Sequence, residues 1–502
     1  MKFLRLLVIS VALFVQPVAN AQGDDFAEFI ERGMELWHVP GAAAAVVTDE
    51  AVVFSQGFGT TSIEDGRPVD EHTAFAIAST TKAMVAMGVL MLVDDGKLSL
   101  DDPITRHIPE LHFSDPFMDE EITVRDLLAH RTGLPSTDTW SFMMNMPIDE
   151  QIGRLRYVKR AAGIRTEKIY QNTMYDLLGV LIHVLDGREW HVYLAEELWQ
   201  PIGMHETWTA RDDIPADTSR VQPHFYKNEK VLRTPYDLPA DDRMPAGSVW
   251  STIHDMSLWA QFLLRGGVAE GGGRLISEEQ YRQMFEPTML ASVPHFYPTV
   301  ELTQPNFRTY GLAWYQQDFQ GRMIDFHTGS LAGLVAIIGL DREAKRAVLM
   351  LANRDHAEFR HAWLWHVMDE TSGDARRDWN QDVFDLYARN SIARATERKA
   401  MHATRRKGTQ TSVPLEDFVG TYSTPSFGDI EFRLEGDELV ADLPLHQIRL
   451  SHWHDNVFLW NFKPWDFEML VEFRIGFDNT VTALEWGGDT FVKIDVPGQK
   501  AN

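Results

Sequence analysis

The sequence contains no cysteine among its 502 residues. Disulfides, thiolate metal ligands, a cysteine nucleophile and a lipid-bearing N-terminal cysteine are therefore excluded. Basic residues are also scarce, because 47 Lys and Arg stand against 73 Asp and Glu, for a formal net charge of −26. Nucleic acids and anionic membrane surfaces bind through clustered basic residues, so neither is expected as a main partner.

A membrane-spanning segment is not expected at the N-terminus. The apolar stretch from Leu6 to Val15 is about half of the ~20 residues that a bilayer requires. Lys2 and Arg5 precede it, and the small residues Ala19 and Ala21 follow. This order is typical of a secretory signal peptide. We therefore expect residues 1–21 to be removed, which leaves a periplasmic or secreted protein with no stable membrane anchor.

Several motifs of well-known chemistry are missing. No Gly-x-Ser-x-Gly occurs, so an α/β-hydrolase nucleophile elbow is absent, and neither His-Glu-x-x-His nor a phosphate-binding loop is found. His452 and His454 flank Trp453 on an expected strand, a spacing that occasionally binds zinc. A solvent-facing pair is the favoured interpretation. We therefore expect no cofactor and no metal.

The pattern that remains predicts a mixed α+β core. Residues 41–58 are typical of a hairpin, and the apolar run 83–93, closed by Gly96, predicts a buried helix. A mostly helical region follows over 100–290, with one helix at 173–185. Strands are expected at 311–314, 334–340 and 347–352, the last two as an antiparallel pair. Strands at both ends of this region predict one sheet assembled from distant segments.

The C-terminal part differs in composition. Residues 389–407 are rich in Arg and Lys, and a solvated linker helix is favoured over a binding patch. Beyond Pro414, alternating apolar residues predict two hairpins, at 430–443 and 469–486. The expected division is a main domain over 22–375, a basic helical linker over 376–413 and a small antiparallel β-barrel or sandwich over 414–498.

Ser79-Thr80-Thr81-Lys82 begins the expected buried helix. Residues three apart share a helical face, so the Lys82 amine can approach the Ser79 hydroxyl. Free backbone N–H groups at a helix start favour developing negative charge, and a desolvated lysine has a lowered pKa and can accept a proton. Alone, Ser-x-x-Lys is a weak signal, because an N-cap serine with a surface lysine has the same spacing.

Two later segments strengthen the hypothesis of nucleophilic chemistry. Tyr170-Gln171-Asn172 lies in a polar stretch before a helix, and its tyrosine could move a proton beside a cationic lysine. Phe326-His327-Thr328-Gly329-Ser330 is typical of a strand end where glycine permits close backbone approach. A core tyrosine and a strand histidine without a catalytic role are the alternatives.

In this order, the three segments resemble the motifs of the serine β-lactamase and penicillin-binding-protein superfamily, namely Ser-x-x-Lys, Tyr-x-Asn, and Lys-Thr-Gly or a His variant. The resemblance covers roughly residues 30–370. It implies an antiparallel sheet flanked by helices, with an inserted all-helical subdomain. Further similar segments are His38–Gly41, Asp95–Leu98, Asp101–Pro103, Ile122–Leu128, His130–Pro135, Tyr175–Gly179, Gly203-Met204 and Tyr310–Leu312.

The resemblance also implies roles for the site residues. Ser79 would attack a carbonyl, while Lys82 and Tyr170 handle the proton; which of the two is the first base stays open. The substrate-binding residues would be Asn172, His327, Thr328, Gly329 and Ser330. The backbone N–H groups of Ser79 and Ser330 would form the oxyanion hole. The implied function is an exported serine hydrolase cleaving a small amide or ester, either a D-residue peptide or a short-chain ester, through an acyl-enzyme. The alternative is a penicillin-binding sensor that acylates without turnover.

One departure from the family pattern matters. The third motif begins with His327, so a permanent cation is replaced by a group expected to titrate near neutrality. The loss of this cation argues against efficient penicillin hydrolysis. A histidine at this position of the motif resembles D-stereospecific aminopeptidases and related esterases. The C-terminal domain resembles the lipocalin-like barrels of several such hydrolases. We expect it to gate the cleft or to mediate assembly, and a homo-oligomer is left open.

Overall fold

The computed structural model describes residues 18–64, 66–234, 243–371, 373, 376–462 and 467–494. Most of the expected signal peptide therefore lies outside the described residues. None of the helices within these ranges is both long and apolar enough to cross a bilayer.

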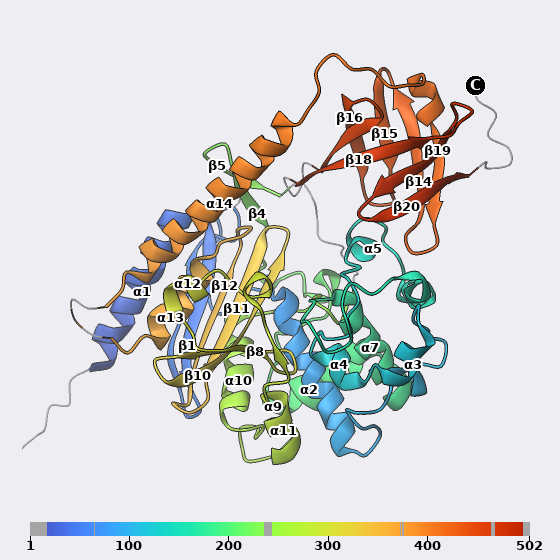
Figure 1. Ribbon diagram of the computed structural model, residues 1–502. Coiled ribbons are helices and arrows are strands. Elements are labelled where there is room, and N and C mark those ends of the chain that lie inside the picture. Colours follow the sequence, from blue (N-terminus) through green and yellow to red (C-terminus); the bar gives the residue numbers. More distant parts are fainter. Residues whose placement is uncertain are drawn as a thin grey trace, which may run out of the picture.

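The centre of the fold is an antiparallel sheet built from segments far apart in the chain (Figure 1). Within the described residues its strand order is β2-β1-β12-β11-β10-β9-β8-β7. The expected hairpin is confirmed, and so is the pairing of the two later strands. The strands are β1 (Gly41–Thr48), β2 (Val52–Gly59), β7 (Met289–Leu290), β8 (Arg308–Tyr310), β9 (Tyr315–Phe319), β10 (Arg322–Leu331), β11 (Leu334–Asp341) and β12 (Arg346–Ala352).

The strand expected at 311–314 is wrong. These residues form the loop between β8 and β9, in which Tyr310 pairs with Tyr315. The Gly311 N–H donates to the Trp314 carbonyl at 2.8 Å, and Ala313 has a φ of +70°. The loop is buried, and its residues are correspondingly apolar. The composition of such a short apolar run does not distinguish a loop from a strand.

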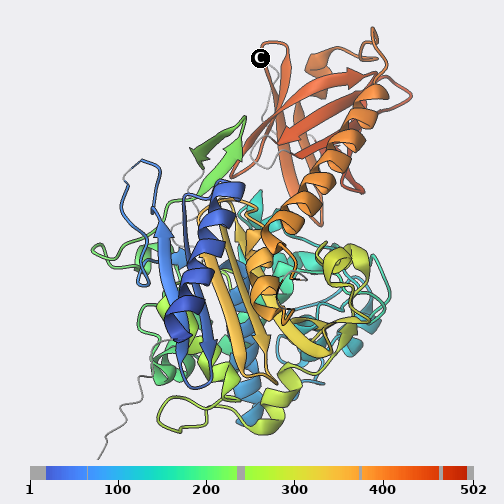
Figure 2. The ribbon, with the colours of Figure 1, turned by 90° about the vertical axis from the view of Figure 1, so that its left-hand side faces the viewer.

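Helices cover both faces of the sheet (Figures 1 and 2). α1 (Val18–Trp37), α13 (Phe359–Met368) and α14 (Trp379–Ala403) lie on one side; α2 (Thr81–Asp94) and α10 (Ile253–Leu264) lie on the other. In β1, Ala43 and Ala45 contact the second group, whereas Ala44 and Val46 contact the first. A sheet buried on both faces needs an uninterrupted apolar strand, as β1 has.

A mainly helical region is inserted between β2 and β7. Its helices are η1 (Ala78–Thr80), α3 (Pro116–Glu121), α4 (Val124–Leu128), α5 (Thr139–Phe142), α6 (Ile148–Arg154), α7 (Asn172–Asp186), α8 (Trp190–Leu194), α9 (Gln200–Ile202) and α11 (Glu278–Met284). α12 (Val300–Thr303) follows β7. Two short strand pairs are β3 (Phe75–Ala76) with β6 (Trp250–Ser251) and β4 (His224–Lys227) with β5 (Lys230–Arg233). Gly96 ends the α2 segment with a φ of +69°, as expected.

The C-terminal strands form a closed barrel, because β13 pairs with both β14 and β20. The expected barrel is therefore confirmed. Its strands are β13 (Gly420–Thr424), β14 (Gly428–Glu435), β15 (Glu438–Asp442), β16 (Gln447–His454), β17 (Val457–Phe462), β18 (Phe467–Ile475), β19 (Val481–Trp486) and β20 (Asp489–Ile494). Phe418, Phe458 and Phe473 pack edge to face in its core. In β16, His452 and His454 are half-buried on either side of a register shift.

The barrel contacts the helical region near α5 (Figure 1). The His446 ring nitrogen Nε2 lies 3.1 Å from the Phe142 carbonyl, and the Leu445 N–H donates to Met143 O at 3.3 Å. The Arg154 guanidinium donates to Pro425 O at 2.8 Å. The segment that carries α5 and α6 therefore touches the barrel at two places.

Candidate active site

Ser79 lies in η1, a single turn that continues directly into α2. Ala78, immediately before it, has a φ of +48°, a left-handed backbone that costs energy in a residue other than glycine. Ser79 is half-buried, whereas Lys82 is fully buried in the first turn of α2. The strained turn thus presents the hydroxyl at the start of a helix, where backbone N–H groups are free.

Lys82 contacts three oxygen atoms. Its Nζ lies 3.1 Å from Ser79 Oγ, 2.8 Å from Asn172 Oδ1 and 2.6 Å from the Ala246 carbonyl. The amide and the carbonyl oxygens can only accept hydrogen bonds. A neutral amine carries two hydrogens and one lone pair. If the two hydrogens go to Asn172 and Ala246, the lone pair faces the Ser79 hydroxyl.

Burial lowers the pKa of Lys82 to about 7, although the charges of Asp176 and Asp138 act in the opposite direction. A lysine without its proton is therefore well populated at neutral pH. Such an amine can take a proton from a neighbouring hydroxyl.

Tyr170 and Asn172 are brought to the nucleophile by the N-terminus of α7. The Lys82 Nζ lies 4.9 Å from the centre of the Tyr170 ring. Burial raises the pKa of Tyr170 well above its ordinary value, and a hydrogen bond with Ser79 offsets only part of this effect. The phenol therefore keeps its proton at neutral pH, so it can donate a hydrogen bond but is a poor base.

The third motif reaches the nucleophile through β10. β9 pairs with β10 only as far as Phe326, and beyond that point β10 packs against η1. A methyl group on Gly329 would come within 2.1 Å of the Ile77 carbonyl oxygen. The close approach expected at this glycine is therefore confirmed, and it brings Ser330 to the strand end beside η1. Thr328 is buried and hydrogen-bonds to Tyr297, whereas Ser330 is exposed.

His327 does not titrate near neutrality, contrary to expectation. Burial, and to a smaller extent the Lys82 charge, lowers its pKa to about 3. Its Nδ1 lies 2.8 Å from the Thr328 carbonyl, so Nδ1 carries the hydrogen. Nε2 then accepts from the Tyr310 hydroxyl, 3.2 Å away. The ring is thus neutral and has no hydrogen left to donate to a substrate carboxylate.

Three functional groups near the site were not predicted. The Ala246 carbonyl that binds Lys82 is a backbone atom and leaves no signal in the sequence. His130 was noted only within a family-like segment, yet its ring lies 4.3 Å from that of Tyr170. Lys168, the third, looks like a surface residue in a polar stretch.

Lys168 is a second buried lysine behind Tyr170. Its Nζ donates to the Tyr315 hydroxyl at 2.8 Å and lies 5.2 Å from the centre of the Tyr170 ring. Burial lowers its pKa to about 7. Its position two residues before Tyr170 is the one available signal, because alternate residues of an extended segment point to the same side.

Comparison with known proteins agrees with this arrangement. Residues 26–371 match the Beta-lactamase family, and residues 404–500 match a Domain of unknown function (DUF3471). Unguisins hydrolase ungD' of Aspergillus campestris is 27% identical over 426 residues, which are 80% of this chain and 76% of that protein. Protein flp of Staphylococcus aureus is 22% identical over 345 residues, which are 67% of this chain and 64% of that protein.

Solved structures share the fold. The octameric penicillin-binding protein homologue from Pyrococcus abyssi has a TM-score of 0.56 at 21% identity, and the match covers 94% of this chain and 99% of that one. The D-stereospecific amidohydrolase from Streptomyces sp. has a TM-score of 0.56 at 20% identity, over 70% of this chain and 99% of that one. Since the family match alone covers well over half of the sequence, the chain belongs to the Beta-lactamase family and is a hydrolytic enzyme with the serine-hydrolase fold of that family.

Proposed function

We propose that this enzyme cleaves a small amide or ester through an acyl-enzyme on Ser79, with unprotonated Lys82 as the first base. The observation that carries the proposal is the set of three contacts to Lys82 Nζ. Asn172 Oδ1 and the Ala246 carbonyl accept its two hydrogens, which leaves the lone pair for the Ser79 hydroxyl, whose Oγ lies 3.1 Å from Nζ.

The reaction follows from these contacts. Lys82 takes the Ser79 proton while Oγ attacks the substrate carbonyl, and the tetrahedral oxyanion forms. In this mechanism the backbone N–H groups of Ser79 and Ser330 would stabilise it. Lys82, now protonated, supplies a proton to the leaving group, with the Tyr170 hydroxyl as the relay beside it. Water then attacks the acyl-enzyme by the same route in reverse and frees Ser79.

The third motif narrows the substrate class. A β-lactam or a D-Ala-D-Ala peptide carries a carboxylate that a cation normally holds at the third motif, and the neutral His327 ring cannot serve as that cation. We therefore favour substrates without a carboxylate at this position: amides of D-residues first, and short-chain esters second. The Streptomyces neighbour is a D-stereospecific amidohydrolase, which supports amides.

We also propose that the mature enzyme is exported and begins near Gln22, on the strength of the N-terminal sequence pattern. N-terminal sequencing of the protein recovered from a bacterial periplasm or medium tests this.

An octameric structural neighbour supports assembly into a homo-oligomer. Light scattering on the full-length chain measures the assembly state directly, and a monomer would contradict it.

The test of the function compares wild type with Ser79→Ala on three chromogenic probes: a D-alanyl anilide, a short-chain nitrophenyl ester and a cephalosporin. We expect sustained turnover of the anilide or the ester, the cephalosporin slowest, and no turnover in the variant. A stoichiometric burst without turnover would favour the penicillin-binding sensor instead. Equal rates in wild type and Ser79→Ala would contradict the proposal.

A further inference from the structure

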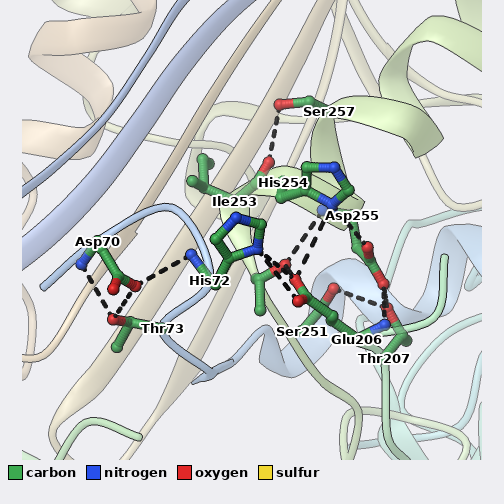
Figure 3. Close-up of polar contacts among 11 residues, drawn as sticks. Asp70, His72, Thr73, Glu206, Thr207, Ser251, Ile253, His254, Asp255 and Ser257 are labelled. Atoms are coloured by element: carbon green, nitrogen blue, oxygen red, sulfur yellow. Dashed lines mark hydrogen bonds and ion pairs between the residues drawn. The ribbon is translucent and has the colours of Figure 1, made fainter. Parts of the chain in front are cut away.

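Three side chains with metal-binding atoms, none of them in the three sequence motifs, meet near the surface (Figure 3). His72 lies in the loop before β3, Glu206 follows α9, and His254 lies in the first turn of α10. One ligand atom from each lies within 4.8 Å of the others. Their side chains are 58%, 34% and 49% exposed, so solvent ions reach all three.

We propose that His72, Glu206 and His254 bind a divalent transition metal, with zinc as the best match. Two imidazoles and one carboxylate are a ligand set that zinc prefers, with water in the fourth position. Neighbouring ligand atoms around a tetrahedral zinc lie about 3.3 Å apart, given bonds of about 2.0–2.1 Å. Here Glu206 Oε2 lies 2.9 Å from His72 Nδ1 and 3.9 Å from His254 Nδ1.

Further contacts hold these ligands in place, as they do in established metal sites. The Thr252 hydroxyl lies 3.2 Å from Glu206 Oε2. The buried Asp255 carboxylate accepts from the Glu206 N–H at 2.6 Å and so fixes the backbone of this ligand. Asp255 also lies 3.1 Å from His254 Nδ1, a contact that a metal bound to Nδ1 would replace.

The position of the site indicates a structural role. β3 pairs antiparallel with β6, Phe75 with Ser251 and Ala76 with Trp250. β3 leads from His72 toward Ser79, and β6 leads from Ala246 toward His254. The Ile77 N–H continues this pairing by donating to Val249 O at 2.9 Å. A metal would tie together the loop before β3, the segment after α9 and the start of α10. A chain without cysteine has no disulfide to do the same.

The experiment uses the full chain without a histidine tag, stripped with EDTA and dialysed. Zinc binding is measured by competition with a chromogenic chelator, together with thermal unfolding with and without zinc. The test variants are the double substitution His72→Ala with His254→Ala, and Glu206→Gln. His112→Ala is the matched control, because its Nδ1 also lies 2.9 Å from a carboxylate, that of Asp119, without a second histidine in the described residues around it.

We expect one zinc per chain with a Kd on the order of 1 µM or lower. Zinc should raise the Tm of wild type and of the control by about 2–4 °C. In the test variants, affinity should fall at least about tenfold and the Tm should no longer respond. The proposal is overturned if wild type binds no zinc, or if the test variants bind it as wild type does. Circular dichroism checks that each variant is folded, and the single variant Glu206→Gln decides if the double variant is not.

Discussion

At the level of single residues, the proposed mechanism gives different roles to Lys82, the base, and Tyr170, the proton relay. Both groups flank Ser79, and burial acts on them in opposite chemical directions. Burial lowers the pKa of Lys82 to about 7, so that its neutral amine is available as a base. It raises the pKa of Tyr170, so that the phenolate, the basic form of this residue, does not form at neutral pH. The motif pattern could not separate these roles, because the difference comes from the surroundings and not from the spacing.

Replacing each of the two groups should therefore have unequal effects. We expect Lys82→Met to lower kcat/KM by about 10³–10⁴-fold, because it removes the base. Tyr170→Phe should cost about 10–100-fold, because it removes only a relay and keeps the ring. Steady-state kinetics on the best chromogenic substrate measures both. A larger loss for Tyr170→Phe than for Lys82→Met would reverse the assignment.

We expect protonated Lys168 to act through its charge on Lys82, the base of the proposed mechanism. Lys168 is buried behind Tyr170. The Nζ atoms of Lys168 and Lys82 lie 5.2 Å and 4.9 Å from the centre of the Tyr170 ring. Removing a neighbouring positive charge raises the pKa of a lysine. In Lys168→Met we therefore expect the acid side of the pH–activity profile to move to higher pH by about 0.5–1 unit. Lys168→Arg, which keeps the charge, should restore the position of the profile. A loss of activity with no movement of the profile would indicate a packing role only.

Among the helices and strands, the sequence predicted α2, α7, the first hairpin and the β11–β12 pair, because each has a continuous or periodic apolar pattern. It missed the loop at 311–314, where burial is tertiary and the apolar residues are not in a strand. It also missed Lys168, whose burial depends on Tyr310 and Tyr315, far along the chain. The spacing of apolar residues within a segment identifies a helix or strand. The contacts that bury a polar residue come from segments far apart in the chain, so the neighbouring sequence does not reveal them.

The close contact between β10 and η1 at Gly329 can be tested directly. Gly329→Ala should push the two apart, because the added methyl would lie 2.1 Å from the Ile77 carbonyl. We expect kcat/KM to fall at least about 10²-fold through misplacement of the oxyanion donors. Gly273→Ala is the control, since a methyl there meets nothing within 4 Å. Kinetics and thermal unfolding are measured together, and near wild-type activity in Gly329→Ala would show that the contact does not position the site.

At the scale of the whole molecule, the sequence predicted a barrel after a basic helix but not where the barrel would lie. It rests on the segment of α5 and α6, through His446 and Arg154. That segment also carries Asp138, whose carboxylate accepts from the Asn172 N–H at 3.3 Å. A short series of contacts therefore links the barrel to Asn172, which lies beside Lys82.

Loosening this contact should alter substrate handling. We expect His446→Ala combined with Arg154→Ala to change kcat/KM for the D-alanyl anilide by a factor on the order of 3–10, about 0.7–1.4 kcal/mol. Arg449→Ala, which breaks ion pairs within the barrel, is the control and should leave the rate unchanged. If the double variant and a chain truncated at Thr411 both keep the wild-type rate, the barrel does not gate the cleft.

The most direct test of the central claim is the rate at which a fluorophosphonate modifies the protein between pH 5 and pH 9, with the modified residue identified by mass spectrometry. We expect modification of Ser79, absent in Ser79→Ala. The rate should be half-maximal near pH 7 and should fall on the acid side, because Lys82 is protonated below its pKa of about 7 and cannot accept the Ser79 proton. A rate that does not vary over this range, or a label on another residue, would contradict the claim that unprotonated Lys82 activates Ser79.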